Sequence, residues 1–160
     1  MKHHMFGVGV VAIDPTTRGF AYAVLEGKKN LVDWGLIHVL LRSDKNILSR
    51  VEEILDRTLP DLLVIEDGRC TRRRERARRL IKGIECIAKH RKLQVVRISR
   101  AQVQDAFCPA VTKQQIAEAL ARAFPELVPR LPRIRKAWMC EDERMNIFDA
   151  VSLALTALSK

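Results

Sequence analysis

Three apolar segments follow one another within the first 41 residues, and the connections between them are too short to contain a helix. The segments cover residues 7–13, 18–26 and 31–41, and the second connection reads GKKN. Connections this short join neighbouring strands that run in opposite directions. The sequence therefore predicts a fold that begins with three antiparallel strands lying side by side. Gly19 is expected to be required by the backbone geometry where the second strand begins.

The rest of the chain alternates between helix and strand patterns. A helix capped by Ser43 or Asp44 is predicted to end before Pro60. Two further strands are predicted, at residues 62–66 and 93–98, with a helix at 72–90 between them. Two helices follow, one with a Thr112–Gln115 capping box and one at residues 141–158. A strand-helix-strand unit is normally right-handed and parallel, so the fourth and fifth strands should run parallel to the first. The prediction is a single α/β domain over residues 1–160. It has three layers, with helices on both faces of a five-stranded mixed sheet.

The positive charge is concentrated in one segment. The formal net charge is +10, and residues 69–100 contain 13 Lys or Arg against 2 Glu. Such a concentration indicates a surface that binds a polyanion, and the guanidinium groups favour phosphate, although a solvated surface helix is the simpler alternative. The candidate nucleic-acid-binding residues in this segment are Arg69, Arg72, Arg73, Arg74, Arg76, Arg79 and Lys82.

The sequence also bears on location. No apolar run approaches the ~20 residues that a membrane helix needs, and the N-terminal MKHHMFG lacks a secretory signal pattern. The four cysteines are scattered without a CxxC pair, so they are interpreted as reduced thiols. A cytoplasmic protein without a membrane partner is expected.

Acidic residues lie at the ends of apolar segments. Asp14 ends the first predicted strand and Glu66 ends the fourth, so both should emerge at the same edge of the sheet. Asp142, Asn146 and Asp149 are spaced i, i+4, i+7, which places them on one face of a helix. Like charges in a partly buried place need a counter-ion, which could be the arginines after Glu66 or a divalent cation. Oxygen ligands without clustered His or Cys favour Mg²⁺, with Mn²⁺ as a possible substitute.

A pair of such ions can activate a water molecule and stabilise the leaving oxygen of a phosphodiester. Carboxylates beside an arginine-rich surface therefore predict hydrolysis of a nucleic acid.

The ordered motifs AIDPTTRGFAYAV, PDLLVIE and FDAVSLAL resemble the RuvC-type Holliday-junction resolvases of the ribonuclease H-like superfamily. The resemblance implies a ribonuclease H-like fold and a metal-dependent endonuclease in which Asp14, Glu66 and Asp149 bind two Mg²⁺ ions and are catalytic. Lys113, in TKQQ, matches a lysine near the scissile phosphate. The resemblance also implies branched DNA as the substrate, in preference to RNA, and a homodimer.

The sequence departs from the family at three places. Asn146 is neutral where the family has an acid or His, and Asp142 is a candidate to complete the metal site. The segment DGRCTRRR after Glu66 lacks the family's aromatic residue, and Gln104 stands in place of a second lysine. Trp34 and Trp138 are interpreted as packing or edge residues.

Three other hypotheses remain open. One is a ribonuclease H-like nuclease that processes structured RNA with the same acids. Another is a catalytically weakened nucleic-acid-binding protein, with Asn146 marking a decayed site. The last is a phosphate-binding ATPase of the actin and sugar-kinase type, suggested by DPTTRG, although those proteins need two such domains.

Overall fold

A computed structural model describes residues 7–41, 43–68 and 75–160, and it contains one five-stranded sheet. The strands lie in the order β3-β2-β1-β4-β5 and are β1 (Gly9–Pro15), β2 (Gly19–Glu26), β3 (Leu31–His38), β4 (Leu62–Glu66) and β5 (Gln94–Ile98). β1, β2 and β3 pair antiparallel, whereas β4 runs parallel to β1 and to β5. The predicted strand directions are confirmed.

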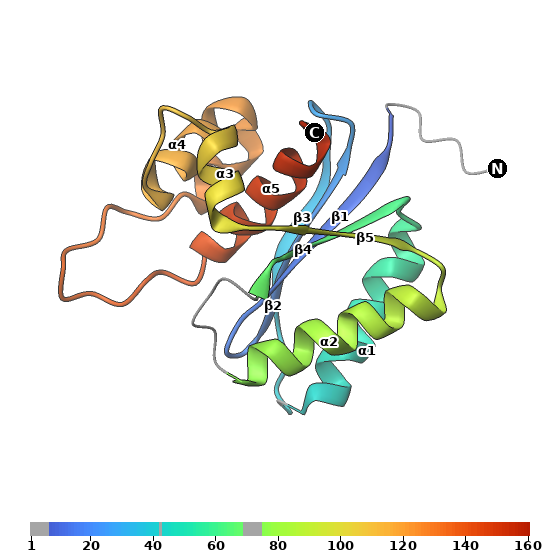
Figure 1. The fold of residues 1–160 in the computed structure, drawn as a ribbon. Coiled ribbons are helices and arrows are strands. Elements are labelled where there is room, and N and C mark those ends of the chain that lie inside the picture. The colour runs from blue at the N-terminus through green and yellow to red at the C-terminus, as the bar shows by residue number, and fades with distance from the viewer. Residues whose placement is uncertain (1–6, 42, 69–74) are drawn as a thin grey trace.

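Helices cover both faces of the sheet (Figure 1). One face carries α1 (Asp44–Thr58) and α2 (Glu75–His90), and the other carries α3 (Arg100–Ala106), α4 (Lys113–Ala123) and α5 (Met145–Leu158). A 3₁₀ helix, η2 (Pro125–Arg130), follows α4. The predicted three-layer α/β architecture is therefore confirmed. None of the helices in the described ranges is long and apolar enough to cross a membrane.

The alternation of side chains along β1 explains the two cores. Val11 and Ile13 pack with the apolar faces of α1 and α2, whereas Val10 and Ala12 pack with α5. Successive side chains of a strand point to opposite faces, so a strand in the middle of the sheet must be apolar throughout. All four residues are fully buried, and β1 is the central strand.

Gly19 lies where β2 and β3 approach each other closely. A Cβ atom at this position would lie 1.9 Å from the carbonyl oxygen of Ile37, well inside van der Waals contact. The expectation that Gly19 is required by backbone geometry is confirmed, and the reason is the neighbouring strand.

The helices differ from the predictions in two ways. The seven-residue α3, which begins with a Ser99–Gln102 capping box, was not predicted, because a helix this short shows little apolar periodicity. α5 begins at Met145 and not at residue 141. The side chain of Asp142 accepts hydrogen bonds from Arg144, and the Met145 N–H donates to the Asp142 carbonyl, so a turn precedes the helix. Asp142 therefore does not share a helical face with Asn146.

Candidate active site

The acids of β1 and β4 meet at one edge of the sheet. Ile13 lies opposite Ile65 in the parallel ladder, so Asp14 and Glu66, the next residues, leave the two strands at the same end. Asp14 is only 3% exposed. Burying a carboxylate is unfavourable unless it is paired or binds a cation. A cationic partner for Asp14 is therefore expected at this edge of the sheet.

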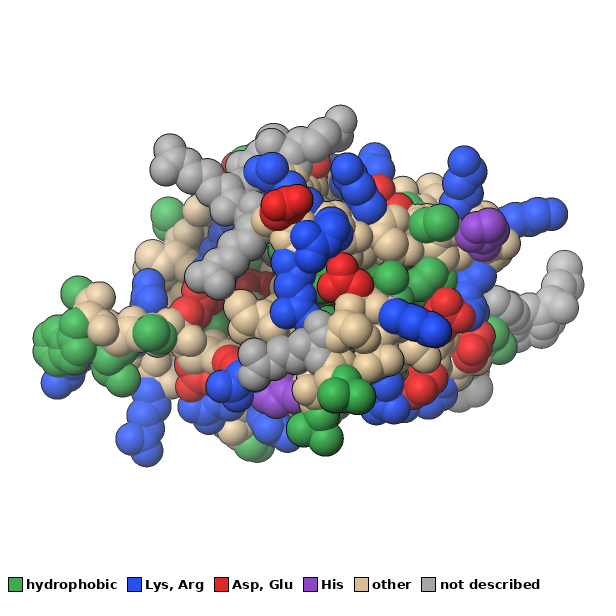
Figure 2. Space-filling model, turned by 90° about the horizontal axis from the view of Figure 1, so that it is seen from below, with side chains coloured by type: hydrophobic (Ala, Val, Ile, Leu, Met, Phe, Trp, Pro, Cys, Tyr) green, Lys and Arg blue, Asp and Glu red, His purple; other side chains and the backbone are tan. Residues whose placement is uncertain are grey.

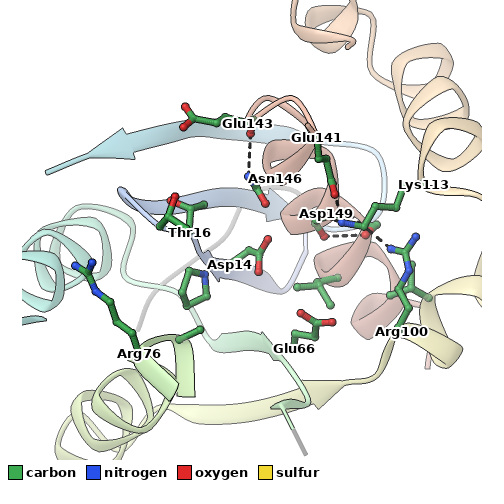
Figure 3. A pocket seen from close by; sticks show the side chains of 16 residues that line it. Asp14, Thr16, Glu66, Arg76, Arg100, Lys113, Glu141, Glu143, Asn146 and Asp149 are labelled. Carbon is green, nitrogen blue, oxygen red and sulfur yellow. Dashed lines mark hydrogen bonds and ion pairs between the residues drawn. The ribbon is translucent and has the colours of Figure 1, made fainter. Parts of the chain in front are cut away.

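A pocket of about 560 Å³ opens at this edge (Figure 3). Asp14 and Glu66 enter it from the sheet, Asp149 and Asn146 from α5, and Lys113 from the start of α4. Thus four of the predicted metal ligands and the predicted catalytic lysine line one pocket. The other polar or charged lining residues are Thr16, Thr17, Arg76, Arg100, Glu141, Glu143 and Ser152.

Asp149 lies between two basic side chains. One of its carboxylate oxygens accepts a hydrogen bond from the Lys113 ammonium at 2.9 Å, and the other lies 3.6 Å from the Arg100 guanidinium. Burial raises the pKa of Asp149, and the charges of Lys113 and Arg100 oppose that rise. The carboxylate is held in a fixed place at the pocket wall by these contacts.

Lys113 bridges two carboxylates. Its ammonium lies 2.9 Å from Asp149 and 2.8 Å from Glu141. Burial alone would lower the pKa of Lys113, but the adjacent charges of Asp149 and Glu141 outweigh this effect and raise it. Lys113 is therefore a fixed cation in the pocket at neutral pH.

Asn146 lies one turn before Asp149 on α5. Its side-chain amide donates a hydrogen bond to the backbone carbonyl of Glu143 at 3.1 Å, so the amide oxygen is the atom that it can offer to a cation. Glu143 itself contacts His38 at 3.1 Å and Arg18 at 3.4 Å.

Asp142 is the predicted ligand that does not line the pocket. Both of its carboxylate oxygens contact the Arg144 side chain, at distances from 2.6 to 3.1 Å. Hydrogen bonds from the Arg144 side chain, opposed by slight desolvation, lower the pKa of Asp142. Its carboxylate stabilises the turn before α5 through these contacts with Arg144.

The donor atoms of the pocket fit a hard divalent cation by type. Asp14, Glu66 and Asp149 supply carboxylate oxygens and Asn146 supplies an amide oxygen, which are the ligands that Mg²⁺ and Mn²⁺ prefer. Their present arrangement is more open than a metal cluster, since the described residues contain no group of three His, Cys, Asp or Glu side chains close enough to hold an ion. The Asp149 carboxylate instead contacts Lys113 and Arg100.

The predicted nucleic-acid-binding residues are only partly described. Arg76 lines the pocket. Arg79, one turn later on α2, is exposed and contacts Asp44. Lys82 is also exposed and lines a second hollow with Arg78 and Arg97. Four predicted residues lie outside the described ranges, namely Arg69, Arg72, Arg73 and Arg74.

Sequence reasoning missed Arg100, Glu141 and Glu143. Arg100 follows β5 by two residues, and the carboxyl end of β5 lies beside that of β4, so its position along the chain was a usable signal. The two glutamates belong to an EDE run that precedes α5 and has no helical periodicity. Only the folded loop brings them to the pocket.

Comparison with solved structures shows which fold this is. RuvC of T. thermophilus in complex with a Holliday junction substrate is 20% identical with a TM-score of 0.70, over 94% of this chain and 93% of that one. A second structure of Thermus thermophilus RuvC, with the same identity and coverage, has a TM-score of 0.66. Fowlpox virus resolvase, in complex with substrate Holliday junction DNA, is 15% identical with a TM-score of 0.55, over 94% of this chain and 97% of that one.

The predicted ribonuclease H-like fold is confirmed by these similarities. No protein-family model matches the sequence, and no curated protein is significantly similar to it.

Proposed function

We propose that this chain, which has the fold of RuvC, is a metal-dependent endonuclease that hydrolyses phosphodiester bonds of branched DNA. The observation that carries the proposal is the convergence of Asp14, Glu66 and Asp149, from β1, β4 and α5, on one pocket that also contains Lys113 and Arg100. Two of the similar structures are complexes with Holliday junction DNA, which supports branched DNA as the substrate.

Asp14, Glu66 and Asp149 would hold Mg²⁺ or Mn²⁺, with Asn146 as a neutral oxygen ligand. When bound, such ions make a water molecule nucleophilic and stabilise the leaving oxygen of a phosphodiester. The nearly complete burial of Asp14 supports its role as a ligand, because a buried carboxylate gains most from a cation.

The basic residues of the pocket bind and orient the substrate backbone. Lys113 and Arg100 reduce the negative field of Asp149, so a polyanion can approach the acids. Arg76, at the opposite wall of the pocket in Figure 3, is placed to contact a neighbouring phosphate. Lys113 remains protonated at neutral pH and supplies a fixed positive charge for the scissile phosphate.

The proposal is tested by cleavage of a four-way DNA junction by the wild type, Asp14→Asn and Asp56→Asn. Asp56 lies on α1, where its exposed carboxylate contacts Arg91, so Asp56→Asn makes the same chemical change away from the pocket. Asp14→Asn should abolish Mg²⁺-dependent cleavage and leave junction binding equal or tighter, whereas Asp56→Asn should cleave normally. Cleavage by Asp14→Asn at the wild-type rate would overturn the assignment of the site.

The substrate is tested separately, with duplex DNA, four-way DNA junctions and hairpin RNA incubated with Mg²⁺ and with Mn²⁺. The proposal predicts junction cleavage above duplex cleavage. Cleavage of the RNA hairpin alone would support the RNA-processing alternative and reject DNA as the substrate.

A two-fold symmetric DNA target is matched most simply by two copies of one chain. The proposal therefore includes a homodimer, which sedimentation of the free protein would detect. A protein that remained monomeric on the junction would contradict this part.

A further inference from the structure

The segment between η2 and α5 projects from the body of the molecule (Figure 1). Residues 133–140, here called the arm, contain no helix or strand, and every residue in them is exposed. Three of the eight are basic, namely Arg133, Arg135 and Lys136. The arm is therefore a positively charged projection.

Both ends of the arm are fixed to the first turn of α4. Before the arm, the carbonyl of buried Pro132 accepts a hydrogen bond from the Gln114 side chain at 3.2 Å. After the arm, Glu141 contacts the Lys113 ammonium at 2.8 Å. Because Lys113 and Gln114 are consecutive and Lys113 lines the pocket, the arm has a defined position beside the candidate active site.

The arm exposes large apolar side chains. Trp138 is 79% exposed and Ile134 is 78% exposed. A turn presents the indole, since the Met139 N–H donates to the Lys136 carbonyl at 3.0 Å and Arg135 donates to the Met139 carbonyl at 3.2 Å. The interpretation of Trp138 as a packing or edge residue is wrong, whereas Trp34 does pack against the core. Figure 2 shows hydrophobic side chains gathered at one end of the molecule, next to Lys and Arg side chains.

The combination of an exposed indole with cations suits one class of partner. The ammonium of Lys136 lies 5.2 Å from the centre of the Trp138 ring. Among the described residues it is the one charged group placed over the indole, and an ammonium can also bind phosphate. Nucleobases stack on aromatic side chains while Arg and Lys contact the adjoining phosphates. An apolar protein surface, by contrast, would have to desolvate the arm's three cations.

We propose that the arm binds unpaired nucleotides beside the pocket, with Trp138 stacking on a base and Arg133, Arg135 and Lys136 contacting the backbone. Bases inside a duplex have both faces covered by their neighbours, so the indole selects a single strand, a gap or a branch point. The proposal rests on the proposed function for the identity of the substrate.

The distance along the chain supports this placement. Glu141, at the pocket, is the third residue after Trp138, which is at most about 10–11 Å of extended chain. The indole therefore lies close to the pocket, so a base stacked on it would belong to a nucleotide near the phosphate in the pocket.

Binding is measured in the presence of a chelator, so that the result does not depend on cleavage. The variant Trp34→Phe leaves Trp138 as the sole tryptophan, and its fluorescence should be quenched by single-stranded DNA or a four-way junction but not by a blunt duplex. Trp138→Ala should weaken binding of the single strand and the junction by about 5- to 150-fold, which is the range for one base stacked on an aromatic side chain. Trp138→Phe should restore most of this loss.

The matched control is Leu40→Ala, which removes an apolar side chain that is 99% exposed and lies outside the arm. It should leave the affinity for every DNA unchanged. Trp138→Ala should also bind the blunt duplex within about twofold of the wild type, because the phosphate contacts are retained.

Unchanged junction binding by Trp138→Ala, or no quenching in Trp34→Phe, would overturn the proposal. Conversion of a dimer to a monomer by Trp138→Ala, with equal loss of all DNA binding, would also overturn it and identify the arm as a contact between two copies. A third outcome separates the two proposals. If DNA quenches Trp138 and Trp138→Ala selectively loses junction binding, but the wild type cleaves no substrate, the result would support nucleotide binding by the arm and reject the proposed nuclease activity.

Discussion

At the scale of single residues, much of the site's electrostatics depends on pairs that neutralise each other locally. Lys113 and Arg100 compensate Asp149 and Glu141 inside the pocket, and Arg144 compensates Asp142 outside it. The difference between the two aspartates comes from their surroundings. The buried Asp149 has a raised pKa, whereas the more exposed Asp142, held by hydrogen bonds, has a lowered one.

Tyr22, the single tyrosine of the chain, gives a prediction that spectroscopy can check. Burial raises the pKa of its phenol, and the nearby charge of Asp33, which accepts the phenol's hydrogen bond at 3.1 Å, raises it further. The neutral phenol therefore stabilises the fold below its ordinary pKa of about 10, and this contribution is lost as the pH rises through the folded-state value. Asp33→Asn should bring the pKa closer to that of the unfolded chain.

The measurement is the ultraviolet absorbance of tyrosinate against pH for the wild type, Asp33→Asn and the chain unfolded in denaturant. Equal pKa values in the folded and unfolded wild type would contradict the raised pKa, and equal values in the folded wild type and Asp33→Asn would show that Asp33 does not contribute to it.

At the scale of elements, two helix N-termini deliver the basic residues to Asp149. Ser99 caps α3, whose first residue is Arg100, and Thr112 caps α4, whose first residue is Lys113. In each cap the side-chain oxygen accepts the backbone N–H of the third helical residue, and the side-chain oxygen of that residue accepts the backbone N–H of the capping residue. The direction in which each helix begins is thus set by the sequence, and the basic side chains follow from it.

Thr112→Ala should therefore affect cleavage as well as stability. Loss of the cap should lower the free energy of unfolding by about 0.5–2 kcal/mol, and displacement of Lys113 should lower the cleavage rate of the folded protein. Thr58→Ala removes a side-chain hydrogen bond at the last turn of α1, away from the pocket residues, and should lower stability with a normal rate. The readouts are denaturant unfolding and single-turnover cleavage; equal rates for the two variants would contradict the positioning role.

The elements also show how far the sequence could predict the structure. Residues 62–66 and the Thr112–Gln115 capping box were predicted correctly, because apolar runs and capping residues act locally. α3 and the start of α5 were not, since one is too short to show periodicity and the other is set by the contacts of Asp142 with Arg144. The same limit applies to the pocket.

Within the pocket, the acids at strand ends could be found because parallel strands bring their carboxyl ends to one edge. Arg100, two residues after β5, could have been found by the same argument. Glu141 reaches the pocket through its contact with Lys113, a tertiary arrangement that no spacing in the sequence encodes.

At the scale of the whole molecule, the chain has a formal net charge of +10, whereas its pocket contains several acids. In the proposed function, the field attracts a polyanion over a long range, and the acids act at the point where the backbone is cut. Under this proposal, binding depends on basic residues and cleavage on acidic residues that line the same pocket.

Junction affinity should consequently fall steeply with salt. If six to ten phosphates are contacted, the affinity should fall by about 10³- to 10⁵-fold between about 50 and 200 mM salt. The Asp14→Asn variant should show a similar slope, because the released counter-ions belong to the basic residues. Fluorescence anisotropy of a labelled junction over a salt series measures both slopes, and a flat dependence would show that phosphate contacts contribute little.

The two contacts that fix the ends of the arm affect how far its length and sequence can vary. Because Gln114 and Lys113 hold its ends on a single helical turn, the chain returns close to the place that it left. Loop-closure entropy grows only slowly with loop length, so a longer or shorter insert at this point would disturb the fold little. If the two proposals hold, evolution or a protein engineer could replace this segment and so change which nucleic-acid shapes are bound, while the residues proposed to cut the backbone stay in place.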